Sequence, residues 1–571
     1  MRAVPTGSSP GSACALGRTL ACACAVFAAA ASRAAAAPAE LGHPVMREFP
    51  PGKSKINHLC QAVIQADDGA ILLANGISAC EYDGAAWRKI ALPTECAGLR
   101  QFARIADGTV FAGGAGGIGF FRAAGLEHEF VSLADRLPPS ATGCDEISAV
   151  LADGDTVYFA DAEKILAWRD GRFALTPLGA PARATAARLH LAAGIVYVTG
   201  VGRPLARLDH GELIPVADDA AWPGDELLLV EPVAEGADGA LRVLTAGRGF
   251  FLVSPDGRVA PLAAEANRWL AGKKILRAAR APDGALAVAF TSVSGDGGMR
   301  FAADGTYAGA LDQSVGLYVK TLRALFFDRE GGLWLGTETG LIRLEWPSAL
   351  TLFDSVNGLG TGAVADVARH DGTLYAATGE GVFVLHPADA DAGDGRAARF
   401  ERLLAAPAYA LVSHPGGLLA LGYEEVFAQT PSGFAAIAKI PPGGGALRRS
   451  HRDPARVWIE ATDGLRAVHF TADGWRDEGL ARNVAGALPE PPAAAEPMPP
   501  NLPGLATDSA GAITRVLTER SAAGTVRWIA GAKALVRLDA SHPWPRPHRG
   551  PRASSPPACA AASGSRPPTR R

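Results

Sequence analysis

The chain has 571 residues, several times the usual length of one domain, so it can hold more than one folding unit or one large repetitive unit. Its 67 Gly and 41 Pro are spread along the sequence, which favours many short strands joined by turns. The formal net charge of -3 leaves no excess of Lys or Arg to bind a nucleic acid backbone, so no nucleic acid partner is expected.

The N-terminal segment predicts export. An apolar run from Leu20 to Ala31 follows Arg18, and the small residues Ala34 to Ala37 offer Ala-x-Ala cleavage sites. The run is too short and too rich in alanine for a membrane span, which needs about 20 apolar residues. We therefore expect residues 1–37 to be a signal peptide, with no membrane span after it. The protein would then be periplasmic or secreted, in a bacterium.

Four cysteines lie between the signal segment and the C-terminal tail: Cys60, Cys80, Cys96 and Cys144. Export permits disulfide bonds, but four irregularly spaced cysteines in so long a chain do not form a framework. The sequence contains no C-x-x-C pair, the pattern that would indicate zinc binding or thiol redox chemistry. Buried free thiols, or one or two disulfide bonds, both agree with this pattern, and the sequence does not assign a pairing.

A turn of small residues followed by a β-rich run recurs along the chain. In the clearest copy, Asp328 to Glu345, one strand is expected at Leu333 to Gly336 and a second at Leu341 to Leu344, joined by a polar turn. This copy predicts a β-hairpin with Trp334 packed inside. The glycines of the first turn recur about every 43 residues, at Gly69, Gly108, Gly154, Gly194, Gly239, Gly284, Gly332, Gly372 and Gly417.

This spacing matches the length of a four-stranded propeller blade. We therefore expect an all-β chain folded as a β-propeller. A row of β-sandwiches is the alternative, but it does not require one hairpin motif at an even spacing. Gly69 through Gly332 mark seven blades, so residues 48–350 are expected to form a seven-bladed ring. Residues 351–540 are expected to form a partial second ring of four or five blades, with strand starts at Gly372, Gly417, Arg456 and Val526.

The C-terminal residues 541–571 differ in composition from the rest of the chain. They contain many Pro and Arg, no Asp or Glu, and no strand pattern. Such a mixture does not bury enough apolar surface to fold, so it predicts a disordered tail. A natural basic tail and an out-of-frame translation both agree with this composition.

The clearest copy resembles the repeat of the two-component-regulator propellers, the periplasmic sensor domains of hybrid histidine kinases and related bacterial receptors. Asn357-Gly358-Leu359 resembles the N-G-L that commonly follows that repeat. The positions that fit the repeat pattern are Asp328, Gly331, Leu333, Trp334, Leu335, Gly336, Thr337, Gly340, Leu341 and Leu344. The other copies in the chain are more degenerate.

The resemblance implies a ligand-sensing module of a signal-transduction receptor. Such a module binds an extracellular signal, in that family often an oligosaccharide, and relays it to a kinase-type output that is absent from this chain. It also implies a homodimer, as in receptor ectodomains, and no enzymatic activity. The alternative is an exported propeller enzyme, a polysaccharide lyase or glycosidase, in which acids such as Asp145 and Glu146 would act.

Motifs for cofactor or metal chemistry are weak. The glycines from Gly114 to Gly119 match G-x-G-x-x-G, but Phe120 continues as strand instead of opening a helix, so a hairpin turn is expected. The acidic run at Asp389, Asp391 and Asp394 lacks the spacing of a calcium loop and is expected to be solvated. No nucleophile elbow and no H-E-x-x-H occurs. The sequence therefore assigns no catalytic residue, no cofactor and no metal ligand.

The sequence leaves the ligand-binding residues unknown. Aromatic residues near predicted turns offer one set of candidates, because aromatic rings stack on sugars; packing inside the blades is the alternative expectation for them. These residues are Trp222, Tyr318, Tyr423 and Trp475.

Overall fold

The computed structural model describes residues 40–539, apart from 53–55, 58, 77, 126, 142–145, 180–185, 219, 221, 223, 234–238, 263–264, 292–296, 346–347, 389–397, 444, 482–510 and 522–523. The predicted signal peptide and tail, together with Cys144, Asp145 and the acidic run at 389–394, lie outside the described residues.

The first part of the chain forms seven four-stranded antiparallel sheets. The first sheet contains β3 (Cys60–Gln65), β4 (Ile71–Asn75), β5 (Ser78–Tyr82) and β6 (Trp87–Ile90). The second contains β7 (Leu99–Arg104), β8 (Val110–Gly114), β9 (Gly117–Ala124) and β10 (Glu127–Ser132). The third contains β11 (Ala149–Asp153), β12 (Thr156–Ala160), β13 (Lys164–Arg169) and β14 (Arg172–Pro177).

The next four sheets continue in the same way. They are β15 (Arg188–Ala192), β16 (Ile195–Gly200), β17 (Arg203–Asp209) and β18 (Glu212–Ala217); β19 (Leu227–Pro232), β20 (Leu241–Thr245), β21 (Gly249–Val253) and β22 (Val259–Pro261); β23 (Ile275–Arg280), β24 (Leu286–Phe290), β25 (Gly298–Phe301) and β26 (Tyr307–Leu311); and β27 (Leu322–Phe327), β28 (Gly332–Thr337), β29 (Gly340–Glu345) and β2 (Met46–Phe49).

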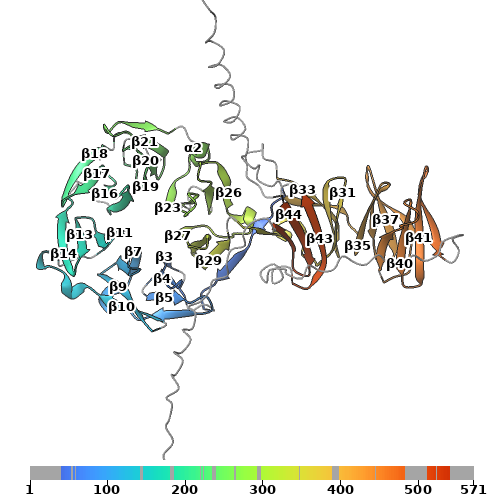
Figure 1. Ribbon diagram of the computed structural model, residues 1–571, viewed down its shortest axis with the longest axis horizontal. Coiled ribbons are helices and arrows are strands. Elements are labelled where there is room, and N and C mark those ends of the chain that lie inside the picture. Colours follow the sequence, from blue (N-terminus) through green and yellow to red (C-terminus); the bar gives the residue numbers. More distant parts are fainter. Residues whose placement is uncertain are drawn as a thin grey trace, which may run out of the picture.

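These seven sheets close into a ring. The first strand of each sheet packs against the first strand of the next, in the order β3, β7, β11, β15, β19, β23 and β27, and β27 packs against β3. Figure 1 shows these inner strands around a common axis and the later strands outside them. Hydrophobic side chains from neighbouring sheets fill the space between the blades, as in the cluster that contains Leu73 and Trp334. The predicted all-β propeller fold is therefore confirmed.

The remaining strands form four further sheets beside the ring (Figure 1). They are β31 (Val364–His370), β32 (Thr373–Thr378), β33 (Gly381–His386) and β34 (Arg399–Leu404); β35 (Ala410–His414), β36 (Gly417–Leu421), β37 (Glu425–Thr430) and β38 (Gly433–Lys439); β39 (Ala446–Arg449), β40 (Arg456–Ala461), β41 (Gly464–Thr471) and β42 (Gly474–Leu480); and a five-stranded sheet of β43 (Ile513–Ser521), β44 (Gly524–Gly531), β45 (Leu535–Asp539), β30 (Leu350–Phe353) and β1 (His43–Pro44).

The inner strands of these four sheets pack in one row, in the order β43, β31, β35 and β39. In the part of the chain that the structure describes, no comparable packing joins β39 to β43. The second set of blades is therefore a partial ring of four sheets.

The N-terminal segment belongs to both sets of sheets. In β1, His43 pairs with Leu352 of β30, whereas in β2, Met46 pairs with Leu344 of β29. The strand β2 thereby supplies the outer strand that completes the seventh sheet of the closed ring. The division of the chain into 48–350 and 351–540 stays a prediction, because these few residues connect the two sets.

The repeat motif of the seventh sheet has a structural role. Asp328 is fully buried, and its carboxylate accepts hydrogen bonds from the Trp334 indole N–H at 2.8 Å and from the Gly332 backbone N–H at 2.6 Å. The Arg343 guanidinium donates to the same carboxylate at 2.7 Å and lies over the Trp334 ring. A buried carboxylate is stabilised when such donors replace water. The motif therefore fixes the turn to the blade core.

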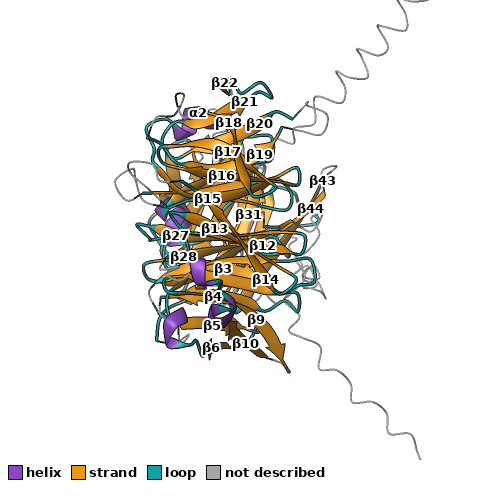
Figure 2. Cartoon of the chain, turned by 90° about the vertical axis from the view of Figure 1, so that its left-hand side faces the viewer, coloured by secondary structure: helices purple, strands orange, loops and turns teal. Residues whose placement is uncertain are grey.

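The helices of the described residues lie in connections that lead into an inner strand. They are η1 (Thr94–Cys96), η2 (Ala134–Arg136), η3 (Pro139–Ala141), α2 (Glu265–Leu270), η4 (Gln313–Val315) and η5 (Ser355–Asn357). In Figure 2 the visible helices gather toward one face of the ring, which is the face where inner strands begin. Among helices in the described residues, none has the length and apolar character to cross a membrane.

Two smaller expectations have a clear outcome. The G-x-G-x-x-G glycines form a hairpin turn, in which Gly114 pairs with Gly117 and the chain continues as β9, so the predicted turn is confirmed. Cys60 and Cys80 are buried free thiols, and Cys96 is also buried. Burial, with a smaller contribution from the neighbouring Cys80, raises the pKa of Cys60 to about 12.

Candidate functional site

The seven inner strands run in the same direction around the axis. Near their ends, Arg104 of β7 contacts Asp67 in the turn after β3, and Arg280 of β23 donates to Glu231 of β19 at 2.7 Å. Near their beginnings, Arg188 of β15 forms an ion pair with Glu226, the residue before β19. The ends of the inner strands therefore lie together at one mouth of the ring, and their beginnings lie together at the other mouth. The two mouths carry different ion pairs.

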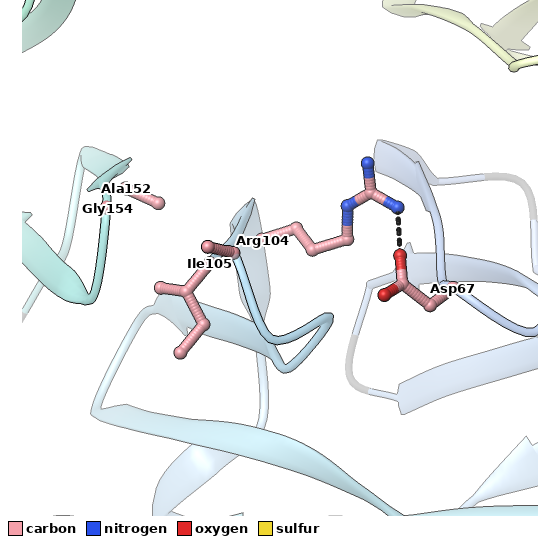
Figure 3. Close-up of a pocket in the computed structure, with 6 residues that line it drawn as sticks. Asp67, Arg104, Ile105, Ala152 and Gly154 are labelled. Carbon is pink, nitrogen blue, oxygen red and sulfur yellow. Dashed lines mark hydrogen bonds and ion pairs between the residues drawn. The ribbon is translucent and has the colours of Figure 1, made fainter.

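A pocket of about 330 Å³ lies where three inner strands end. Its lining comes from the ends of β7 and β11 and from the turns that follow β3, β7 and β11, which belong to three consecutive blades: Asp67, Arg104, Ile105, Ala106, Ala152 and Gly154. Figure 3 shows the Arg104 guanidinium directed at the Asp67 carboxylate, with Ile105 and Ala152 at the other side. The pocket thus combines one ion pair with a small apolar wall, a combination suited to a polar ligand with an apolar face.

The seventh blade supports this mouth from the other side. The Arg329 guanidinium donates to the Asp67 backbone carbonyl at 3.1 Å and lies 3.6 Å from the Asp67 carboxylate. Gln65 joins the same turn, because it donates to Glu330 at 2.8 Å and accepts from the Arg329 backbone N–H at 2.8 Å. Asp67 is therefore held between two guanidinium groups, and its turn is fixed where the ring closes.

A cluster of three potential metal ligands lies between the first and second blades. Asp68, Glu81 and His128 place one ligand atom each within 4.8 Å of one another. The His128 Nδ1 lies 2.9 Å from a Glu81 oxygen, and the Arg88 guanidinium pairs with the same carboxylate. A cation at Glu81 would have to compete with Arg88. The arrangement fits an ion-pair network between two blades better than a metal site.

This network shifts the pKa values of both partners. The hydrogen bond to Glu81 is the largest cause that raises the pKa of His128, and burial opposes it. Burial is the largest single effect on Glu81 and raises its pKa, but the hydrogen bonds from His128 and the positive charges of His128 and Arg88 together lower it. Both directions favour the charged forms, the imidazolium of His128 and the carboxylate of Glu81.

The aromatic candidates separate into two groups. The Trp222 side chain is 1% exposed and packs edge-on against Phe251, and the Trp475 ring packs against His414 at 4.7 Å between centroids. Trp222 is therefore a core residue, and Trp475 is a partly buried residue that packs against a core cluster. Tyr318 is 72% exposed and Tyr423 is 50% exposed.

Tyr318 lines a second pocket of about 220 Å³, formed with Phe49 and Pro50 after β2 and with Thr339 and Leu341 of the seventh blade. The sequence did not predict this pocket, because one part of its lining comes from the N-terminal strand β2 and the other part from the seventh blade. The pocket therefore joins residues that are almost 300 positions apart in the chain.

Asp145 and Glu146, the example of an acid pair for the enzyme alternative, are not both among the described residues. Asp145 lies outside them, and Glu146 forms an exposed ion pair with Arg100. Glu146 therefore lies at the opposite mouth from the pocket in Figure 3.

No protein-family model matches the sequence, and no curated protein matches it. Among solved structures, the chain is similar to the extracellular domain of the hybrid two component system BT3049 from B. thetaiotaomicron. The TM-score is 0.53 at 12% identity, and the match covers 87% of this chain and 83% of that chain.

Two further solved structures match less well. The extracellular domain of the hybrid two component system BT4673 from B. thetaiotaomicron gives a TM-score of 0.41 at 13% identity, over 85% of this chain and 64% of that chain. The virginiamycin B lyase from Staphylococcus aureus gives a TM-score of 0.39 at 13% identity, over 53% of this chain and 99% of that chain. Because both scores are below 0.5, neither carries an argument. The comparison with the first structure establishes the fold: this chain folds like the extracellular propeller domain of a bacterial hybrid two-component system.

Proposed function

We propose that this protein is an exported ligand-sensing module of a bacterial signal-transduction system. The observation that carries the proposal is the pocket in Figure 3, which the turns of three consecutive blades build at one mouth of the closed ring. Loops held by a rigid scaffold are the usual place for ligand binding. The fold similarity to the extracellular domain of a hybrid two component system supports a role in sensing.

The ligand class proposed for this pocket is an oligosaccharide. The Asp67 carboxylate and the Arg104 guanidinium offer acceptors and donors to sugar hydroxyls, and Ile105 and Ala152 offer a small apolar wall. Sugars present both hydroxyl groups and apolar C–H faces, which matches such a mixed lining. The bound state would be relayed to a kinase-type output, and the periplasm is the expected compartment.

A thermal-shift screen of the full chain with oligosaccharides from polysaccharide breakdown tests this function. We expect at least one of them to raise the unfolding midpoint, and we expect Ala152→Trp, which fills the pocket, to abolish the effect. Ala174→Trp on the exposed outer strand β14 of the same blade is the matched control and should leave binding unchanged. The proposal fails if no oligosaccharide binds or if Ala152→Trp binds as well as the wild type. Release of cleaved products would instead support the enzyme alternative.

A further inference from the structure

The mouth opposite the pocket carries an unbalanced set of positive side chains. Two arginines there are paired, Arg100 with Glu146 and Arg188 with Glu226. Two others, Arg277 of β23 and Arg323 of β27, form no ion pair with any residue that the structure describes.

The two unpaired arginines are also poorly hydrogen-bonded. Arg277 donates only to the backbone carbonyl of Leu276, at 3.0 Å, and the Nε of Arg323 is buried without a partner among the described residues. A buried guanidinium N–H that lacks an acceptor has lost its hydration without a replacement. Both side chains therefore have donor capacity left for an added acceptor.

These arginines all lie near the beginnings of inner strands, at one mouth of the ring. Arg277 interacts electrostatically with Arg323 of the neighbouring sheet and with Arg188, which lies two sheets away beyond β19. Arg188 and Arg277 belong to the inner strands on either side of β19, and all three of these strands begin at this mouth. Burial first, and then repulsion from Arg188 and Arg323, lowers the pKa of Arg277, with Glu226 opposing.

His190 is the other titratable side chain of β15 on this side of the ring. It follows Arg188 on β15 by two residues and is partly accessible to solvent, yet burial followed by the charge of Arg188 lowers its pKa to about 3. Its Nε2 lies 3.1 Å from the Thr199 hydroxyl. His190 is therefore neutral, and the arginines alone provide the positive charge.

Local backbone geometry explains how the arginines reach this place. The inner strands β23 and β27 each contain a β-bulge near their beginning, between Ile275 and Arg277 and between Leu322 and Ala324. A bulge inserts one residue and redirects the side chains next to it. Arg277 directly follows the extra residue of β23, and Arg323 is the extra residue of β27.

We propose that Arg277 and Arg323, with Arg188, form a binding site for an oxyanion group of a small ligand, a carboxylate, phosphate or sulfate, at this mouth of the ring. Guanidinium groups bind such groups through paired N–H donors, which both neutralises the charge and satisfies the donors. Glu226 holds Arg188 in place and limits the net charge, so the site is suited to one anionic group. This site is separate from the pocket of the proposed function, because it lies where inner strands begin.

Titration calorimetry on the full chain tests the site. The dissociation constants of inorganic sulfate, inorganic phosphate and glucuronate are compared with that of chloride at constant ionic strength. The anion that binds most tightly shows whether the site prefers a sulfate, a phosphate or a carboxylate group. We expect one-to-one binding of at least one oxyanion, weakened about tenfold or more by Arg277→Met and by Arg323→Met. Arg258→Met is the matched control, because that side chain is 86% exposed and pairs with Asp256.

The outcomes separate clearly. If no oxyanion binds more tightly than chloride, or if both variants bind as the wild type does, the site does not exist. Loss of binding in Arg258→Met as well would show a general charge effect and would also overturn the proposal. Because Arg277→Met removes a largely buried cation that forms no ion pair with a described residue, we expect its unfolding midpoint to be no lower than that of the wild type. Oligosaccharide binding at the other mouth is measured separately and does not depend on these results.

Discussion

Replacing Asp328 tests whether the repeat motif holds the closed ring together. Its buried carboxylate accepts from the Trp334 indole, from the Gly332 backbone and from Arg343. In Asp328→Ala these donors lose their acceptor, and the mostly buried Arg343 keeps only its pair with Glu345. Removing one partner of a buried ion pair costs roughly 3–5 kcal/mol. Because Glu345 remains, we expect a loss of about 3 kcal/mol, a large part of the usual 5–15 kcal/mol.

Urea unfolding followed by tryptophan fluorescence measures this loss, since Trp334 reports on the affected turn. Asp328→Asn keeps one acceptor oxygen but loses the charge, so its loss should be intermediate. The control Asp256→Ala removes a half-exposed carboxylate and should change the free energy of unfolding by less than about 0.5 kcal/mol. If Asp328→Ala stays within about 1 kcal/mol of the wild type, the motif does not stabilise the ring as argued.

Three further predictions concern titration and ion pairs. The Cys60 thiol, with a pKa of about 12, should not react with a thiol reagent at pH 8 until the protein is denatured; rapid labelling of the native protein would contradict this. The raised pKa of His128 means that its pair with Glu81 stabilises fully below pH 6.5 and loses this effect as pH rises through the folded-state pKa. His128→Gln should therefore flatten the decrease in urea midpoint above pH 6.5, and an unchanged slope would be inconsistent with the pair. Arg369→Met removes the ion-pair partner of Glu40 and Glu519, although Trp528 still donates to Glu519, and should cost about 1 kcal/mol in urea unfolding. An unchanged midpoint would show that these ion pairs contribute nothing.

Glycine turns at an even spacing were enough to predict the sheets. Each turn needs a backbone that glycine adopts easily, as Gly331 does with φ of 89°, and each is followed by an apolar strand. The closing strand was not predicted, because Met46 to Phe49 is a short isolated run whose partner, β29, lies near residue 340. A strand without its own turn gives no local signal. Ring closure is set by tertiary packing.

The repeat that carried the family resemblance also explains why the site could not be predicted. Its residues, including Asp328 and Trp334, lie in the blade core and specify a blade. The N-G-L that follows the repeat is part of a second structural motif: Asp354 caps η5 and is followed by Gly358 with φ of 83°, as Asp312 caps η4 and is followed by Gly316 with φ of 80°. Both motifs order the connection between blades. Neither contains a residue of the pocket in Figure 3.

The arginines of the proposed oxyanion site escape sequence reasoning because of the bulges. In a regular strand, counting back from the turn glycine in steps of two gives the residues on one face. A bulge shifts that count by one. The strand β15 is regular, whereas β23 has a bulge at the residue before Arg277 and β27 has a bulge at Arg323 itself. Arg188, Arg277 and Arg323 therefore share no common offset from their turns, although the ring brings them to one place. Only the closed ring, with all seven inner strands parallel around one axis, makes them neighbours.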